Sequence, residues 1–597
     1  MDYIKISLIG LIAVIAYYLL LQWPPSSIEV PINPITSQEN SVVPQELSET
    51  IPIDDGVSID SEPSLTDNET LISAPDDSTS SSGWNEPSKQ VEITPSRIFS
   101  LNSDVLNIEI DAVTGNFIKA GMKDIKVEKG ADESMSLFGR RSIDSEDGCP
   151  IRLGLVQNGY GCVGNYFASS GFIADKKFLH PNFKSMEKLT MGDEGILYTL
   201  YGENSDMLFT RKVWLRPGDY FLDVEDLVRL KGGSEPTTAV PYARIVRDGY
   251  RPPGRFLDFD SYTYLGPVFS TEYDSFGKLD FSDIEEESFD SQSSEGWLAV
   301  VQRYFVSAWV PEQEKIIKYQ ARQMKTTGAF SMALTGQRMP ISDGTSTSFK
   351  NSLYVGPKIA DNLILERDLG SGVDLGLVVD YGFLWWLSEP IHKLMTWGYV
   401  FLGNWGLAIL FATLVLKALL WPLSAAGYRS AAKMRAVGPQ MAELQQKHAN
   451  DKQKLGQEMM AFYKKEGVSP LGGCLPMLLQ MPFFLAFYWV LLDMVELRHA
   501  PFLLWITDLS SYDPFFVLPL LNAGLMYYSQ KMMPVTPSSD PTQQQMQSAM
   551  KFMPIMIAAM FCIFPAGFVL YFTIQSLITV IQQALSFRKA GISLKSV

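Results

Sequence analysis

The hydrophobic residues of this chain gather in long unbroken runs near its start and in its last third. Residues 6–23 form the first run, which as a helix rising about 1.5 Å per residue nearly spans a hydrocarbon core about 30 Å thick. In the last third the pattern predicts five more spans, at 399–421, 473–494, 514–531, 550–564 and 568–586. A membrane protein with six spans is therefore expected.

Residues 564–567, Phe-Pro-Ala-Gly, separate the last two predicted spans. Proline and glycine permit a tight reversal of the chain at this point. The span at 550–564 is short for a full bilayer, which implies local thinning or a tilted neighbour. One long kinked helix is the alternative.

The first run is expected to remain as an N-terminal anchor over 1–23, although a cleaved signal peptide is the rival interpretation. It lacks a small-residue cleavage site and ends with Trp23, a residue typical of a membrane interface. Residues 24–94 follow as an acidic linker, with 13 acidic side chains and one basic one between 24 and 91. Such a segment buries too little apolar surface to fold, so we expect it to be disordered.

Residues 95–365 change to short alternating runs of apolar and polar positions, separated by turn residues. Val105–Ile110 and Leu197–Tyr201 alternate in this way, and Arg216–Asp219 is a turn between two further runs. Repeats of this kind predict a large all-β sandwich. Cys149 and Cys162 lie in this region and could form a disulfide in an oxidising compartment, but two unpaired thiols fit the sequence equally well.

Residues 366–398 are expected to form a linker and then an amphipathic helix that lies in the membrane interface. The helix is predicted from residues 381–395, where Trp385 and Trp386 occur together with Glu389 and Lys393.

Charge divides the chain in the same way as hydrophobicity. Residues 380–597 hold 16 basic and 11 acidic side chains, whereas residues 1–379 hold 33 basic and 55 acidic ones. Loop 422–469 has eight basic groups against four acidic, and loop 495–513 has one basic residue, Arg498. The positive-inside rule places the basic loops and both termini in the cytoplasm and the β domain outside, in the periplasm if the cell has one. The acidic half argues against specific recognition of nucleic acid.

Residues suited to catalysis or metal binding are few. The four histidines and four cysteines do not have the spacing of a metal site, and we find no Gly-rich phosphate loop and no nucleophile–base pair. We therefore expect neither a catalytic site nor a cofactor.

The most informative single residue is Lys417, which lies in an otherwise uncharged apolar run where a charge costs about 2.5–3.5 kcal/mol. Thr413 precedes it by four residues and shares its helical face. The lysine could reach past Pro422 to the cytoplasmic interface, or it could lie in a water-containing recess inside the membrane domain. Polar residues in other predicted spans favour the recess. They include Gln480, Asn522 and Gln575.

Residues 423–469 are predicted to form a helical hairpin in the cytoplasm. Apolar residues recur there at intervals of three and four, which predicts two amphipathic helices with a basic, Met-rich surface for adaptable contacts or for lipid headgroups. The two stripes contain Met434, Met441 and Leu444, and then Leu455, Met459 and Phe462.

Four segments of the last third form a recognisable set: Ser469–Tyr488, Glu496–Phe502, Trp505–Ser510 and Phe564–Tyr571. Together they resemble the YidC/Oxa1/Alb3 family of membrane protein insertases. The N-terminal anchor and large outer domain are similar to the Gram-negative type, whose periplasmic domain is a β-supersandwich similar to sugar mutarotases. The resemblance implies a five-span insertase core within 399–590, a cytoplasmic tail at 591–597, and an inner-membrane location.

The resemblance also implies a hydrophilic groove that is open to the cytoplasm and to lipid and has a basic residue in its first span. Lys417 matches that position, where arginine is common. The lysine keeps the positive charge but cannot bind a carboxylate through two parallel hydrogen bonds as a guanidinium does. Thr413 matches a groove-lining position, and Tyr571 with Phe572 match an aromatic substrate-contact site. The implied partners are nascent membrane proteins, the lipid bilayer, the Sec translocon, the signal recognition particle receptor and the ribosome. The short basic tail departs from members with a long one.

Two other functions are compatible with parts of the pattern. A polytopic small-solute transporter would be favoured by inverted repeats, and we see none in 380–590. A sugar-processing β domain of the galactose mutarotase kind would use paired histidines with a glutamate, but residues 95–365 contain only His180.

Overall fold

The computed structural model describes residues 89–92, 98–127, 129–130, 132–140, 165–249, 264–325, 328–363, 374–448, 451–467, 475–532 and 552–589. These residues belong to two compact units: a β unit that ends at Val379 and a helical unit that begins at Asp380. The expected anchor at 1–23, the expected tail at 591–597, and Cys149 and Cys162 all lie outside the described residues.

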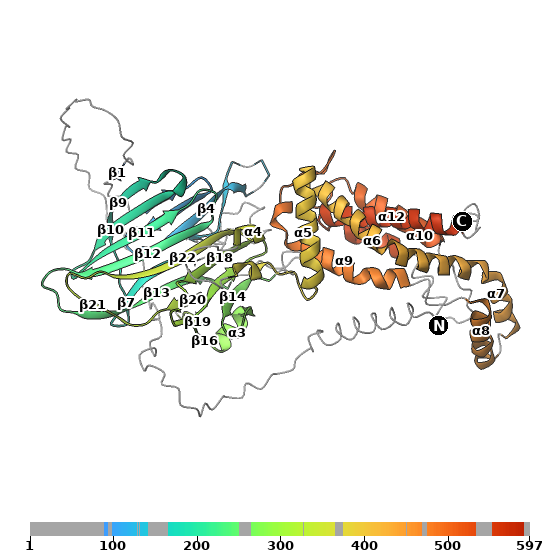
Figure 1. Cartoon of the computed structure of the whole chain (residues 1–597), viewed down its shortest axis with the longest axis horizontal. Helices are drawn as coiled ribbons and strands as arrows, with labels where there is room; N and C mark the ends of the chain where they lie inside the picture. Colours follow the sequence, from blue (N-terminus) through green and yellow to red (C-terminus); the bar gives the residue numbers. More distant parts are fainter. Residues whose placement is uncertain are drawn as a thin grey trace. The chain divides into compact units, whose positions relative to one another are not determined.

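The β unit is an antiparallel sandwich, as the alternating pattern predicted, and Figure 1 shows its strands in blue through green to olive. Its first sheet has ten strands. In spatial order they are β1 (Lys89–Glu92), β9 (Phe183–Thr190), β10 (Ile196–Glu203), β11 (Met207–Leu215), β12 (Phe221–Leu230), β22 (Thr347–Pro357), β18 (Phe305–Pro311), β17 (Gly296–Val301), β14 (Gly266–Thr271) and β15 (Gly277–Lys278).

The second sheet has twelve strands. Its main path runs β16 (Phe289–Ser293), β19 (Ile317–Gln323), β20 (Phe330–Thr335), β13 (Thr237–Arg247), β7 (Asn165–Ala174), β4 (Phe117–Lys126), β3 (Leu106–Asp111) and β2 (Ile98–Asn102). Four short strands pair beside it: β5 (Ser134–Ser136), β6 (Gly139–Arg140), β8 (Lys177–Phe178) and β21 (Met339–Ile341). The described part of the unit also contains the short helices α3 (Phe281–Glu286), α4 (Ala360–Leu363), η1 (Gly192–Glu194) and η3 (Leu375–Val378).

The inner faces of the two sheets make one core. Side chains alternate between buried and partly exposed along all of β11, as expected for a strand with one buried face. The ring of Phe117 on β4 lies 6.1 Å from that of Trp309 on β18, and Tyr166 Oη lies 2.6 Å from Ser307 Oγ. Strand β1 corrects one expectation, because residues 89–92 pair with β9 and are not disordered linker.

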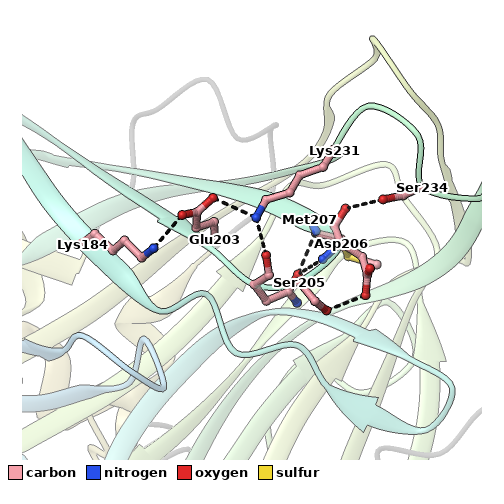
Figure 2. A network of polar contacts seen from close by, with 8 residues as sticks. Lys184, Glu203, Ser205, Asp206, Met207, Lys231 and Ser234 are labelled. Carbon is pink, nitrogen blue, oxygen red and sulfur yellow. Dashed lines mark hydrogen bonds and ion pairs between the residues drawn. The ribbon is translucent and has the colours of Figure 1, made fainter.

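A network of polar contacts ties the β10–β11 turn to its neighbours (Figure 2). Glu203 lies between Lys184 and Lys231, with oxygen–nitrogen distances of 2.6 and 2.8 Å. Asn204 Oδ1 accepts hydrogen bonds from the backbone N–H groups of Asp206 and Met207, which closes the turn.

The helical unit is drawn in yellow to red in Figure 1. Its helices are α5 (Trp385–Leu402), α6 (Trp405–Ala436), α7 (Gly438–Lys447), α8 (Lys452–Glu466), α9 (Leu475–Asp493), α10 (Val517–Met532), the helical segment Phe552–Phe561 and α12 (Ala566–Lys589), with the short η4 (Val495–Leu497) after α9. Among the described residues, α6 and α12 are long and apolar enough to cross a membrane. Gln480–Asp493 and Phe552–Phe561 are shorter apolar helices, so the count of six spans stays a prediction.

The span predicted at 399–421 does not coincide with a single helix. Its first residues complete α5, because Gly403 adopts a left-handed φ of 62° and Asn404 then caps α6 by accepting a hydrogen bond from Leu407 N–H. At the other end α6 continues through Pro422 to Ala436. Ala432 in this extension packs against Met532 and Phe587, and such packing compensates for the hydrogen bond that a proline removes.

The chain reverses between Phe552–Phe561 and α12, as the tight reversal predicted. Phe561 contacts the rings of both Phe568 and Phe572, with centroids 5.9 and 4.9 Å away. In one long helix these residues would lie on different turns, far apart along the helix axis. The alternative of one long kinked helix is therefore wrong.

Candidate functional site

A pocket lies between α6, α9 and α12 of the helical unit, and Lys417 is one of its lining residues. The space between its atoms is about 390 Å³, which includes open solvent. Five of the seven predicted groove residues line it: Thr413, Lys417, Gln480, Tyr571 and Gln575. Leu416, Leu420, Ser424, Phe483 and Phe487 complete the lining.

The Lys417 side chain is held by neutral oxygen atoms. Its Nζ donates hydrogen bonds to Gln480 Oε1 at 3.3 Å and to Thr579 Oγ1 at 3.0 Å. The residue is 6% exposed, which argues against an amine that reaches out to a headgroup layer. Throughout the described ranges, no carboxylate forms an ion pair with this amine. A buried ammonium with two neutral acceptors is incompletely compensated, because ion pairing is the usual condition for burying a charge.

The α6 face that carries Lys417 is set by the helical period. Thr413 and Lys417 are four residues apart and both face the pocket. Thr413 Oγ1 donates to Ile409 O at 2.7 Å, so its hydroxyl hydrogen is used within its own helix while its oxygen can still accept.

An aromatic and amide wall faces Lys417 from the other two helices. The ring of Tyr571 stacks on that of Phe487 with centroids 4.3 Å apart and an interplanar angle of 19°. Gln575 lies one turn further along α12, on the same face as Tyr571, and also lines the pocket. The pocket therefore combines one cation, several neutral hydrogen-bonding groups and aromatic faces.

Comparisons with known proteins agree on the family of this chain. Residues 397–591 match the family model described as 60Kd inner membrane protein, and residues 99–394 match the one described as YidC periplasmic domain. Over 586 residues, the chain is 35% identical to the membrane protein insertase YidC of Marinomonas sp. (strain MWYL1), covering 98% of both chains. The chain belongs to the YidC family of membrane protein insertases.

Other YidC proteins give the same match. The membrane protein insertase YidC of Shewanella halifaxensis (strain HAW-EB4) is 37% identical over 503 residues, which cover 83% of this chain and 87% of that one. A crystal structure of an active YidC insertase covers 82% of this chain and 92% of its own, with 14% identity and a TM-score of 0.34, a likeness that adds nothing to the family assignment. The family is one of inner-membrane insertases and not of enzymes.

Two residues predicted for the YidC groove lie elsewhere. Asn522 is completely buried between α10 and α12, where its Nδ2 donates to Ser576 Oγ at 3.2 Å. Phe572 packs among the rings of Phe484, Phe561 and Phe568. Successive residues of a helix point about 100° apart, so Tyr571 can face the pocket while Phe572 faces this ring cluster.

Thr579 is a contact of Lys417 that sequence reasoning missed. It lies four residues after Gln575 and on the same face of α12, and its hydroxyl donates to Gln575 O at 2.8 Å while accepting from Lys417. The four-residue spacing was the signal that could have found it.

The hairpin residues are divided between the inside and the outside of the hairpin. Met434 and Met441 are buried and pack with Val437, Met459 and Tyr463. The prediction that these two residues belong to an exposed contact surface is therefore wrong. The physical reason is that α7 and α8 are too short to be stable alone, so they bury their apolar stripes against each other and against Met434 near the end of α6. Leu444, Leu455 and Phe462 are half-buried, and Met460, which the prediction omitted, is 69% exposed.

Proposed function

We propose that this YidC-family chain inserts membrane proteins by receiving the polar, often acidic flank of a hydrophobic segment in the pocket around Lys417. The single observation that supports this proposal is the buried amine, whose partners in the described parts of the chain are the neutral oxygens of Gln480 and Thr579. An incoming carboxylate would supply the opposite charge that these oxygens do not.

The energetic argument concerns the polar flank. Carrying an ionised group into hydrocarbon is strongly unfavourable, and a site with a cation and hydrogen-bonding groups avoids much of that penalty. Tyr571 and Phe487 would contact the apolar part of the segment beside it, since aromatic faces bury large areas without a polar penalty. The segment would then move into lipid, where burial at about 25 cal/mol per Å² favours insertion. No nucleotide is needed for such a step.

Topology follows from the charge pattern in this proposal. The basic loops and both termini would be cytoplasmic, the β unit periplasmic, and the pocket accessible from the cytoplasm. The partners would be nascent membrane proteins and the bilayer, with the Sec translocon, the signal recognition particle receptor and the ribosome delivering substrates to it.

The test uses two single-span substrates that differ only in a flanking residue, Asp in one and Asn in the other. Lys417→Ala should reduce insertion of the Asp substrate by roughly fivefold to thirtyfold and leave the Asn substrate nearly unchanged, because a charge pair in a partly hydrated site contributes about 1–2 kcal/mol. Lys417→Arg should retain insertion of both. Protease protection in inverted membrane vesicles measures the inserted fraction.

Thr413→Val is the matched control, because it changes the same face of α6 and leaves the charge in place. Photocrosslinking from positions 413 and 571 to a stalled nascent chain shows whether the segment reaches the pocket. Equal insertion of the Asp substrate by the Lys417→Ala, Lys417→Arg and unaltered chains would rule out the proposed role of the cation.

A further inference from the structure

Two side-chain pairs join α10 to α12 with one common spacing. Asn522 Nδ2 donates to Ser576 Oγ at 3.2 Å, and Ser529 Oγ donates to Gln583 Oε1 at 2.9 Å. Both pairs connect residues that are 54 positions apart, and on each helix the second partner follows the first by seven residues. A constant offset means that the helices run parallel, and a seven-residue repeat is the period of a coiled-coil seam.

One partner of each pair is fully buried. Asn522 is 0% exposed and Gln583 is 1% exposed, whereas Ser576 and Ser529 are half-buried. At one end Thr573 Oγ1 lies 3.4 Å from Leu518 O, and at the other Met532 and Phe587 are buried together. The two polar pairs therefore occupy positions that apolar side chains take in most helix pairs.

Stability alone does not explain polar residues at these positions. Within the described residues, Asn522 Oδ1 has no hydrogen-bond partner although it is buried, and an unsatisfied buried oxygen is destabilising. Polar residues in a coiled-coil seam instead specify register, since a slip of one turn, by three or four residues, would leave all of them unpaired. Helices inserted in lipid need such a device more than soluble ones, because uniform apolar surfaces do not distinguish one alignment from the next.

A neighbouring face of α12 shows what the register controls, because Thr579 lies three residues after Ser576 and four before Gln583. Thr579 lies between the two locked levels and accepts a hydrogen bond from Lys417 Nζ at 3.0 Å. A slip of α12 by one turn would move Thr579 by about 5.4 Å along the helix axis, which is too far for that bond. The relative height of Lys417 and Thr579 therefore depends on how α12 is held.

We propose that the pairs Asn522–Ser576 and Ser529–Gln583 form a register lock, which fixes the axial position of α12 against α10 and so places Thr579 beside Lys417. The four side chains are positioning residues. The lock is a property of the helical unit and does not depend on what the pocket binds.

The test measures register directly by disulfide crosslinking of the full chain in membranes. The four native cysteines, Cys149, Cys162, Cys474 and Cys562, are first replaced by serine. Leu525→Cys with Val580→Cys reports the native register, because the two positions lie midway between the locked pairs. Leu525→Cys with Leu577→Cys, or with Ala584→Cys, reports a slip of one turn in either direction.

The lock is removed by apolar replacement of both pairs: Asn522→Leu with Ser576→Ala, and Ser529→Ala with Gln583→Leu. We expect the ratio of native to slipped crosslinks to fall by roughly tenfold, the change that corresponds to two interhelical hydrogen bonds of the strength found in membranes. Exchanging the partners, as Asn522→Ser with Ser576→Asn and Ser529→Gln with Gln583→Ser, should restore the ratio.

A ratio that stays unchanged without the pairs would overturn the proposal. Where the fourfold variant does not accumulate in the membrane, Asn522→Leu with Ser576→Ala alone keeps the second pair and should give an intermediate ratio; an unchanged ratio there would overturn it as well. Thr396→Val on α5 is the control, because its hydroxyl donates only to His392 O of its own helix. Since crosslinks report register and not insertion, this result is independent of the proposed function.

Discussion

Two buried cations in this chain are held in opposite ways. In the β unit, Arg211 Nε lies 2.7 Å from Asp226 Oδ1, and its guanidinium also donates to Ser170 O at 2.8 Å. The rings of Phe117 and Phe183 lie against the same guanidinium. Among the described residues, the hydrogen-bond partners of Lys417 in the helical unit are neutral. A fully paired cation is suited to holding two sheets together, whereas an incompletely paired one is suited to binding an anion.

The Arg211–Asp226 pair yields a prediction for the stability of the β unit. Asp226→Asn should lower its free energy of unfolding by about 3–5 kcal/mol, because the change leaves a buried guanidinium without its counter-charge. Denaturant unfolding of the detergent-solubilised chain, followed by tryptophan fluorescence, measures it, since Trp297 and Trp309 are fully buried in this unit.

Glu109→Gln is the matched control. It breaks the Lys119–Glu109 pair, whose nitrogen–oxygen distance is 2.9 Å and whose side chains are 46% and 23% exposed. Exposed pairs contribute about 0–1 kcal/mol, so this variant should unfold nearly as the unaltered chain does. Similar losses in the two variants would contradict the structural role of Asp226.

At the scale of elements, the network around Glu203 joins three parts of the first sheet (Figure 2). Lys184 comes from β9, Glu203 ends β10, and Lys231 follows β12 and also donates to Asn204 O at 2.6 Å. Hydrogen bonds and charge from Lys184 and Lys231 lower the pKa of the Glu203 carboxyl from its ordinary value of 4.5 to about 2. The carboxylate therefore favours the folded turn only while it is ionised.

This pKa shift predicts a pH dependence of the β10–β11 turn. A carboxyl whose pKa is lower in the folded state contributes stability above its unfolded pKa of about 4.5, and that contribution is lost as the pH falls toward 2. Glu203→Gln should therefore speed hydrogen exchange at residues 204–207 at pH 7, and the difference from the unaltered chain should shrink between pH 4.5 and pH 2. Hydrogen exchange with mass spectrometry measures both chains at each pH. A difference that is constant with pH would show that the charge of Glu203 is not responsible.

At the scale of the whole molecule, each unit supplies its own key feature: the helical unit supplies the pocket residues, and the β unit supplies its own hydrophobic core. Every described residue that lines the pocket comes from α6, α9 or α12. The β unit has its own core, in which Trp297, Trp309 and Tyr319 are among the largest fully buried side chains. Such separation is expected when two compact units fold in different surroundings, here water for the β unit and lipid for the helical unit.

A deletion tests this separation. Replacing residues 98–357 by a short Gly/Ser linker should preserve the preference for the Asp-flanked over the Asn-flanked substrate, because the helical unit alone supplies the pocket. Insertion in membrane vesicles measures the ratio, and Lys417→Ala in the shortened chain is the control that should abolish it. Loss of the preference in a shortened chain that still accumulates in the membrane would show that the β unit contributes to the site.

The sequence by itself determined the class of each unit and the residue at the centre of the site. Alternation with a period of two identified the sandwich, and long apolar runs identified the helical unit. Lys417 stood out because a charge in an apolar run is costly and so needs a reason. These conclusions depend on short-range periods and on single-residue energies, which a sequence displays directly.

Only the tertiary structure decided which neighbours cover each face. Lys417 contacts Gln480 and Thr579, which are 63 and 162 positions away in the sequence. A helical period relates only residues a few positions apart, so it cannot predict these contacts. For the same reason the sequence did not predict that Asn522 lies in the α10–α12 seam and not in the pocket. It also did not predict that Met434 and Met441 are buried inside the hairpin. A helical pattern shows which side chains share a face, but the partner of that face is set by the packing of elements that are remote along the chain.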